Sequence, residues 1–222
     1  MTYRNPLAAP ADLEGWVAEG PVGVEHVDGG MRLRSTADEP ALAAAGRGDH
    51  AHITFWCPEV FGPDVEIAWD FRPLAGAGLA MLFFAATGTE ERDLFDPSLA
   101  PRSGYYPQYH SGDVRTLHVS YYRRKWPSER RFHTCNLRKS PGFHLVAQGA
   151  DPLPPLADVD DHYRVRVTKR GPEVAFAIDD LELFRWVDDG TTGPPLGAGR
   201  IGFRQMAPLT AHYRNLEVTP LS

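Results

Sequence analysis

Three short stretches in the middle of the chain place side chains that can hydrogen-bond or move protons at every second position. These side chains are His118 and Tyr122 within 114–122, Asn136 and Arg138 within 132–138, and His144 and Gln148 within 143–148. Side chains two residues apart project from the same face of a β-strand. We therefore expect three successive strands to present one shared polar face.

The residue types on this face are those that a sugar ligand requires. Asn, Gln, Arg and His pair with hydroxyl groups in fixed geometry, and an Arg guanidinium binds a carboxylate through two parallel hydrogen bonds. Aromatic rings offer flat apolar surfaces to sugar C–H faces, and the candidates are Trp126, Tyr122 and Tyr109. The predicted substrate-binding residues are Arg123, Lys125, Trp126, Asn136, Arg138 and Gln148, and the predicted catalytic residues are His118, Tyr122 and His144.

A strongly basic segment runs through these strands. Between Arg115 and Lys139 eight Arg or Lys residues accompany one acid, Glu129, so the segment carries +7, the whole chain −6 and the remainder −13. Such a concentration repels itself and indicates an anionic partner or an internal salt network. In the plainer interpretation it is a solvated loop whose charges pair with acids further along the chain, namely Asp158, Asp160 and Asp161.

The elements that must position these residues are predicted to be strands. The chain contains 21 Gly and 20 Pro, which leaves little room for long helices, and short helical turns are expected only at 39–45 and 90–95. Polar and apolar residues alternate in segments such as 66–72, 163–169 and 173–178, at a spacing of about ten residues. This rhythm is typical of an all-β sandwich of antiparallel sheets, and we expect residues 1–222 to form one domain.

Composition narrows the classes of partner and compartment. A net charge of −6 argues against general nucleic-acid binding, and no apolar run approaches the roughly 20 residues of a membrane helix. The first residues contain no apolar signal core, so we expect a cytoplasmic protein. The two cysteines, Cys57 and Cys135, are then expected to be buried thiols, without zinc-site spacing.

Long blocks of this sequence resemble the YesU-like family of uncharacterised bacterial proteins. The central block runs from Tyr109 to Pro152, a second block begins at Asp188 and ends at Val218, and the opening contributes LEGW at 13–16 and EGP at 19–21. The resemblance implies the concanavalin A-like lectin and glucanase superfamily, with a jelly-roll sandwich whose concave sheet binds ligand. It also implies a substrate class, pectin-type acidic polysaccharide such as rhamnogalacturonan.

The sequence departs from the catalytic glucanases of that superfamily, which carry two Glu side chains on one strand face. The nearest match is Glu66 and Asp70, so ordinary double-displacement hydrolysis is not expected. Jelly-roll lyases offer a second comparison, in which Arg138 neutralises a uronate and His118 or Tyr122 takes a proton. A binding protein, a lyase or atypical hydrolase, and a non-catalytic assembly protein that forms a homodimer or heteromer through its Arg-rich loop all stay open.

Calcium is the one cofactor that the resemblance suggests, since lectins of this superfamily often bind it. The acids that could supply oxygen ligands are Asp158, Asp160 and Asp161, or Asp188 and Asp189. Clustered acids in loops are more often solvated turns, so we predict no metal-ligating residues.

Overall fold

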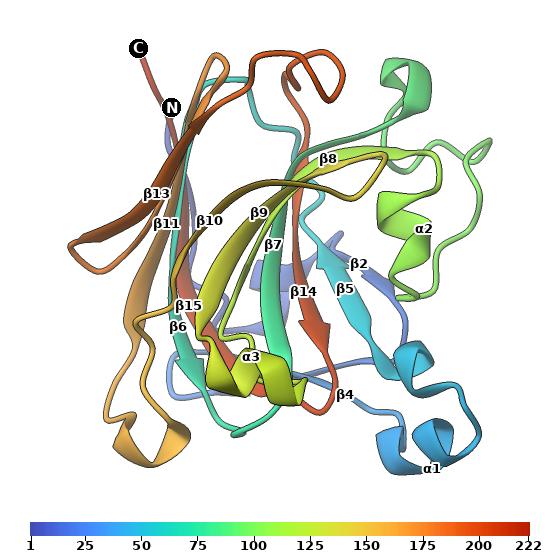
Figure 1. Ribbon diagram of the computed structural model, residues 1–222, viewed down its shortest axis with the longest axis vertical. Coiled ribbons are helices and arrows are strands. Elements are labelled where there is room, and N and C mark those ends of the chain that lie inside the picture. The colour runs from blue at the N-terminus through green and yellow to red at the C-terminus, as the bar shows by residue number, and fades with distance from the viewer.

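The chain folds into two antiparallel sheets that pack face to face, as a computed structural model covering residues 1–222 shows (Figure 1). The eight-stranded sheet has the order β13-β12-β11-β6-β15-β4-β3, with β1 added beside β15. Its strands are β1 Tyr3–Asn5, β3 Val22–Val27, β4 Gly30–Ser35, β6 Val65–Pro73, β11 Tyr163–Arg170, β12 Glu173–Ile178, β13 Leu181–Val187 and β15 Thr210–Pro220. The first strand therefore pairs with the last.

The seven-stranded sheet has the order β10-β9-β8-β7-β14-β5-β2. Its strands are β2 Val17–Glu19, β5 Ile53–Trp56, β7 Leu79–Gly88, β8 Val114–Tyr121, β9 Thr134–Ser140, β10 His144–Ala150 and β14 Arg200–Met206. The helices are short and lie in the loops: α1 Glu39–Ala44, α2 Pro107–His110 and α3 Pro127–Arg131, with 3-10 turns η1 Pro10–Leu13, η2 Gly48–Ala51, η3 Thr89–Glu91 and η4 Leu156–Asp158. No helix is long and apolar enough to cross a membrane.

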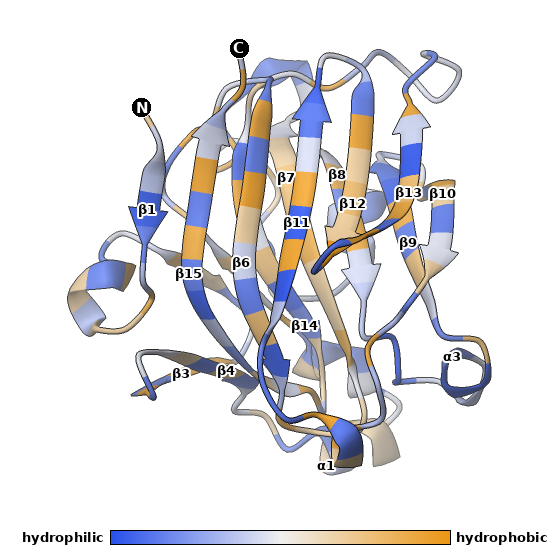
Figure 2. Cartoon of the chain, turned by 90° about the vertical axis from the view of Figure 1, so that its left-hand side faces the viewer, coloured by the Kyte–Doolittle hydropathy of each residue, from blue (hydrophilic) through white to orange (hydrophobic).

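Period-two alternation explains the strands of the eight-stranded sheet. Along β6 the residues Ile67, Trp69 and Phe71 are buried between the sheets, whereas Glu66 and Asp70 are only partly buried. Hydrophobic and hydrophilic bands alternate along β6, β11 and β15 (Figure 2). One face of this sheet therefore supplies the core and the other meets solvent.

The core between the sheets is rich in aromatic rings. The indole of Trp69 donates to the Tyr121 hydroxyl at 3.1 Å, which satisfies both polar groups inside an apolar layer. Phe71 packs edge-to-face on Tyr121 with ring centroids 4.9 Å apart. Cys57 and Cys135 lie in the same layer as free, buried thiols, as the sequence predicts.

A long connection covers part of the outer face of the seven-stranded sheet. The strand β7 is apolar on both faces because the core covers one face and residues 89–113, with α2, lie over the other (Figure 1). Two groups of this connection bind the buried carboxylate of Glu19 in β2: the Tyr109 hydroxyl donates to it at 2.7 Å, and Arg102 Nη2 lies 2.8 Å away. Trp56 Nε1 of β5 also donates to this carboxylate, at 2.8 Å. The uncovered remainder of the face holds the candidate site.

Candidate functional site

A cavity of about 290 Å³ lies on the outer face of the seven-stranded sheet, over the middle strands β7, β8 and β9. Thirteen residues line it: Asp49, His52, Leu79, Met81, Tyr106, Ser120, Arg123, Trp126, Glu129, Asn136, Arg138, Phe143 and Met206. The sheet forms its floor, and the loops before β5 and β8, after β8 and after β9 form its walls. Its size suits one or two sugar units.

Strand register brings the predicted polar side chains together. Ser120 of β8 pairs with Asn136 of β9, which in turn pairs with Gln148 of β10. His118 pairs with Arg138 in the next rung on the same face. The amides of Asn136 and Gln148 lie 2.7 Å apart, so Gln148 reaches the cavity through Asn136 and does not itself line it.

Arg138 is the cation in this cavity that has no carboxylate partner. Its Nη1 donates to the Phe143 carbonyl at 2.9 Å, and its guanidinium carbon lies 3.9 Å from the centre of the Phe143 ring. Partial burial, together with neighbouring Arg123, lowers the pKa of Arg138. The stacked ring fixes the guanidinium plane, and the remaining N–H groups are available to a ligand anion.

Arg204 of β14 is a second cation without an ion pair, and it is completely buried beside the cavity. Its Nη1 donates to Thr54 Oγ1 at 3.1 Å and to the Gly104 carbonyl at 2.9 Å. The guanidinium lies between the rings of Tyr106 and Tyr109, at 4.7 and 4.9 Å from their centroids. Its Nε and Nη2 have no hydrogen-bond partner. A buried charge that only neutral groups contact raises the positive potential of the cavity.

Tyr106 and His118 form a neutral hydrogen-bonded pair at the cavity wall. The Tyr106 hydroxyl lies 2.8 Å from His118 Nε2, and His118 Nδ1 has no partner. Burial, reinforced by Arg138 and Arg204, lowers the pKa of His118 well below its usual value. Burial also raises the pKa of Tyr106 to about 12. His118 is fully buried, so it meets the cavity only through the Tyr106 hydroxyl.

The start of α3 builds the opposite wall. Glu129 accepts from Arg123 Nη2 at 2.9 Å and from the Trp126 backbone N–H at 3.0 Å, which is the reciprocal bond of a helix N-terminus. Arg123 Nη1 also donates to Thr134 Oγ1 at 2.6 Å. These contacts hold the Trp126 ring at the rim, where half of the residue is exposed.

His52 and Asp49 complete the cavity from the turn η2. The Ala207 N–H donates to His52 Nδ1 at 3.2 Å, and His52 Nε2 lies 3.2 Å from the Asp49 carboxylate. Burial, followed by the positive charge of Arg204 and Lys125, lowers the pKa of His52 to about 2. The ring is therefore neutral, and its Nε2–H donates to Asp49.

Comparison with known proteins gives the chain its family. A family model described as a domain of unknown function, DUF1961, matches residues 1–218. The uncharacterized protein YesU of Bacillus subtilis strain 168 is 50% identical over 217 residues, which are 97% of this chain and 94% of that protein. This chain belongs to the DUF1961 family.

Solved structures confirm the architecture of this DUF1961 protein. A Bacillus subtilis protein of unknown function with a galectin-like fold superimposes with a TM-score of 0.92 at 49% identity, covering 98% of this chain and 94% of that one. Carbohydrate-binding module CBM66 of Bacillus subtilis superimposes with a TM-score of 0.56 at 14% identity, covering 93% of this chain and 97% of that one. A β-1,3-1,4-glucanase from a mouse hindgut metagenome superimposes with a TM-score of 0.61 at 13% identity, covering both chains fully. The predicted concanavalin A-like jelly roll is confirmed, and the distant likenesses show the fold alone.

None of the three predicted catalytic residues lines the cavity: His118 lies behind Tyr106, and Tyr122 and His144 point elsewhere. Tyr122 follows the end of β8 with φ of 46°, which turns its ring into the core between the sheets, where its hydroxyl donates to the Ala75 carbonyl at 2.9 Å. A β-bulge between Leu145 and Ala147 shifts the alternation in β10, so His144 pairs with Lys139 and is exposed away from Arg138. Both predictions are wrong for these local backbone reasons.

Two predicted ligand contacts have structural partners instead. Lys125 Nζ donates to the Ala207 carbonyl at 2.7 Å and to Glu39 at 3.2 Å, so it ties the loop to the chain below the cavity. The candidate ring of Tyr109 is fully buried against Glu19. By contrast, Arg123, Trp126, Asn136 and Arg138 line the cavity, and their binding of a substrate stays a prediction.

Much of the basic segment is neutralised internally, but by other acids than those predicted. The ion pairs are Arg123–Glu129, Arg124–Asp151, Lys125–Glu39 and Lys139–Asp188, at 2.7 to 3.2 Å. Asp161 contacts His162, and neither Asp158 nor Asp160 makes an ion pair. Glu66 and Asp70, the nearest match to the paired carboxylates of glucanases, lie on β6 in the other sheet and therefore away from the cavity.

No group of three or more His, Cys, Asp or Glu side chains lies close enough to hold a metal ion. Asp188 accepts from Lys139 and from the Gly190 N–H, and the Asp189 carboxylate closes a turn with Thr191. The carboxylates of Asp188 and Asp189 therefore serve an ion pair and turns.

The sequence analysis missed Arg204, Tyr106, His52 and Asp49. A signal for Arg204 was present, because alternation in 200–206 puts it opposite the apolar residues Ile201 and Phe203. The others come from loops, and only the folded chain brings them to the sheet.

Proposed function

We propose that this protein binds an oligosaccharide in the cavity on the seven-stranded sheet, and that the ligand carries a carboxylate, as the uronates of pectin-type glycans do. Similarly folded proteins include a carbohydrate-binding module, a glucanase and a lumenal domain with bound calcium and a mannose-containing glycan, which is consistent with a sugar ligand. The acidic character is argued from this chain's own residues.

The observation that supports the proposal most is the surplus of unpaired cations. Arg138 lines the cavity without a carboxylate partner, and Arg204 is buried behind Tyr106 with two nitrogen atoms unbonded. The cavity's carboxylates are Glu129, which Arg123 neutralises, and Asp49, which accepts from His52. An anionic ligand would supply the missing negative charge through a charge-assisted bond to Arg138.

The remaining wall suits a sugar. Trp126 offers a half-exposed ring for stacking against C–H groups, and Ser120 with Asn136 offers donors and acceptors for hydroxyls. Leu79, Met81 and Met206 supply an apolar floor. This mixture of a few fixed polar groups on an apolar surface is the usual composition of a small-ligand site.

Isothermal titration calorimetry with oligogalacturonates and their fully methyl-esterified counterparts tests the proposal. The free acids should bind more tightly than the esters, and Arg138→Gln should weaken the acids by tenfold or more, as expected for a lost hydrogen bond between charged groups. Arg131→Gln is the matched control, because Arg131 belongs to the same basic segment but is exposed and unpaired. Equal affinity for acid and ester, or no binding by a folded sample, would exclude an acidic ligand.

The Tyr106–His118 pair supports a second candidate, a lyase acting in the same cavity. The Tyr106 hydroxyl reaches the cavity and has a neutral imidazole behind it to exchange a proton with, while Arg138 could neutralise the uronate. Hydrolysis by paired carboxylates has less support, since both oxygens of Glu129 are engaged. Incubation with oligogalacturonates should then generate ultraviolet absorbance from an unsaturated product, and Tyr106→Phe should abolish it without weakening binding strongly. Binding without any new absorbance would leave the protein a binder only.

A further inference from the structure

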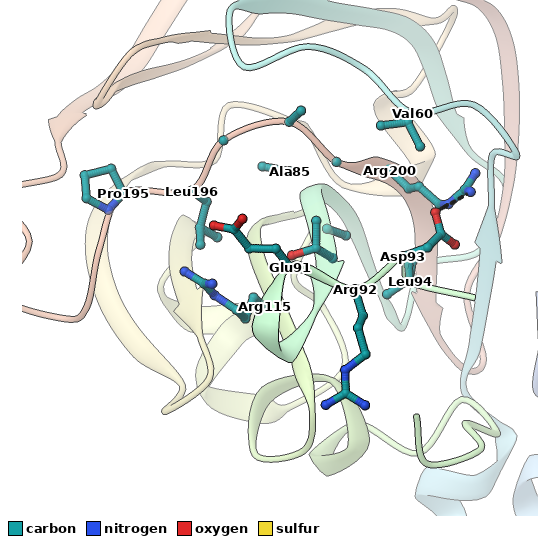
Figure 3. A pocket seen from close by; sticks show the side chains of 15 residues that line it. Val60, Ala85, Glu91, Arg92, Asp93, Leu94, Arg115, Pro195, Leu196 and Arg200 are labelled. Carbon is teal, nitrogen blue, oxygen red and sulfur yellow. Dashed lines mark hydrogen bonds and ion pairs between the residues drawn. The ribbon is translucent and has the colours of Figure 1, made fainter. Parts of the chain in front are cut away.

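A second cavity, of about 450 Å³, opens at the end of the sandwich where β7 ends and β14 begins (Figure 3). Its walls are the end of β7, residues 91–94, Arg115 of β8 and residues 195–200. It shares no lining residue with the first cavity. The inference drawn from it is independent of the acidic-ligand proposal.

The backbone around this end cavity is unusual. Register shifts interrupt β7 on both sides, against β8 between Phe84 and Thr87 and against β14 between Arg200 and Gly202. Buried Ala85, at these shifts, has φ of 49°, and Glu90 and Glu91, just beyond the end of β7, both have φ of 60°. Non-glycine residues rarely adopt this conformation, and such outliers gather at binding sites.

Small residues create the space. At Gly199 an added Cβ would lie 2.4 Å from the Ala85 carbonyl carbon, so the two backbones are in direct contact at the back of the cavity. At Gly197 an added Cβ would meet nothing within 4 Å. The back wall is therefore main chain rather than large side chains.

Hydrogen bonds fix the loop on the open side. Arg92 donates to the Thr89 carbonyl, to Ser98 and to Glu90 at 2.9 to 3.2 Å. Asp93 forms an ion pair with Arg200 at 2.6 Å. Because these charges are already paired, they hold the wall and leave only two charged side chains free.

Those two are Glu91 and Arg115. Neither side chain makes a hydrogen bond or an ion pair, while every other charged residue lining this cavity does. In Figure 3 the Glu91 carboxylate and the Arg115 guanidinium project into the same part of the cavity, beside Leu196. An unpaired acceptor thus faces an unpaired donor across an open space.

We infer that the end cavity is a second binding site, and that its ligand is an uncharged sugar unit. Hydroxyl groups can donate to Glu91 and accept from Arg115 at once, whereas an anion would be repelled by the first and a cation by the second. Val60 and Leu196 give aliphatic surface for the C–H groups of a ring. The molecule would then hold an acidic unit on the sheet and a neutral one at its end.

Nuclear magnetic resonance titration of the ¹⁵N-labelled protein with neutral monosaccharides, D-galactose and D-xylose, tests the inference. We expect amide shifts at residues 85–94 and 195–200. Glu91→Gln and Arg115→Gln should each weaken binding by roughly tenfold, as for a lost hydrogen bond to a charged group. Glu59→Gln is the matched control, because Glu59 is an exposed acid next to Val60, makes no ion pair and does not line the cavity.

Arg138→Gln separates this site from the acidic one, since it should leave the neutral-sugar shifts unchanged. The inference fails if high millimolar sugar produces no shifts, if the shifts lie only around Arg138, or if Glu91→Gln and Arg115→Gln bind as the parent does. Binding of the zwitterion glycine at Glu91 and Arg115 in place of sugars would also overturn it.

Discussion

The outer faces of the two sheets use arginine in different ways. On the eight-stranded sheet many of the cations lie beside an acid: Arg164 and Arg214 beside Asp70, Arg32 and Arg34 beside Glu25, and Arg185 beside Glu173 and Glu182. Arg72, Arg166 and Arg170 of the same sheet make no ion pair. On the seven-stranded sheet Arg138 and Arg204 have no such partner. An arginine that an acid of the fold already neutralises needs no ligand, whereas unpaired arginines in and beside a cavity favour an anion from outside.

The basic segment contains both kinds of residue. Its paired members hold the loop around α3 in place, and among its four members without an ion pair Arg138 is the one that lines the cavity. A large excess of basic residues in a sequence therefore indicates an anion-binding site only after the residues that form internal ion pairs have been discounted. The comparison predicts that changes to paired charges alter stability and that changes at the cavity alter affinity.

Asp151→Ala should have the largest effect on stability. The Asp151 carboxylate accepts from Arg124 Nη1 at 2.8 Å, both side chains are buried, and the substitution leaves the Arg124 charge uncompensated. We expect a loss of about 3–5 kcal/mol in the free energy of unfolding, measured by urea denaturation. The double variant Arg124→Met/Asp151→Leu should recover most of this loss. A loss below about 1 kcal/mol in the single variant would show that the pair is solvated.

Trp126→Ala should weaken oligogalacturonate binding about tenfold while leaving the stability nearly unchanged, because the ring lies at the cavity rim and is 50% exposed. Calorimetry and urea denaturation of the same sample measure the two effects. Phe132→Ala is the control, since Phe132 belongs to the same loop, is 72% exposed and does not line the cavity. Equal losses of affinity in both variants would mean that the aromatic ring acts nonspecifically.

Asp70→Asn should reduce stability at neutral pH by about 1 kcal/mol, as for a partly exposed charged hydrogen-bond network. Partial burial raises the pKa of Asp70, but the hydrogen bonds from Asn215, Arg164 and Arg214 outweigh it and leave the pKa below its usual value. The ionised carboxylate therefore stabilises the fold above the unfolded-state pKa of about 4, and this contribution is lost as the pH falls through the lower folded-state value. The difference in the free energy of unfolding between parent and variant should shrink below pH 4. A difference that grows as the pH falls would mean that the pKa of Asp70 is raised in the folded protein rather than lowered.

Arg185→Gln should change the stability least of these variants, because its ion pairs with Glu173 and Glu182 are exposed on an edge strand. The small effect should fall further when salt is raised to 1 M. Thermal unfolding at two salt concentrations measures it. A larger loss would mean that the paired face contributes more to stability than its exposure allows.

Strand alternation predicts the sheets and much of the cavity floor, because a side chain's face depends only on its own strand. Asn136 and Arg138 lie where period-two spacing puts them, and His118 occupies the expected face although Tyr106 covers it. The prediction fails where the backbone leaves the regular pattern, at the bulge before Gln148 and at the positive φ of Tyr122. Neither feature has a clear signal in the residues around it.

The cavity walls could not be predicted in the same way. Tyr106 belongs to the connection over β7, and His52 and Asp49 to a turn that precedes β5, so their positions depend on contacts between distant segments. The predicted ion-pair partners of the basic segment are wrong for the same reason. The partners of Arg124 and Lys125 lie 27 and 86 residues away along the chain.

A crystal structure of the protein soaked with an oligogalacturonate tests the central claim most directly. The account predicts a sugar carboxylate within hydrogen-bonding distance of the Arg138 guanidinium, with one ring stacked on Trp126. A sugar bound to the eight-stranded sheet, or one whose carboxylate faces solvent in the cavity while a neutral hydroxyl meets Arg138, would contradict it.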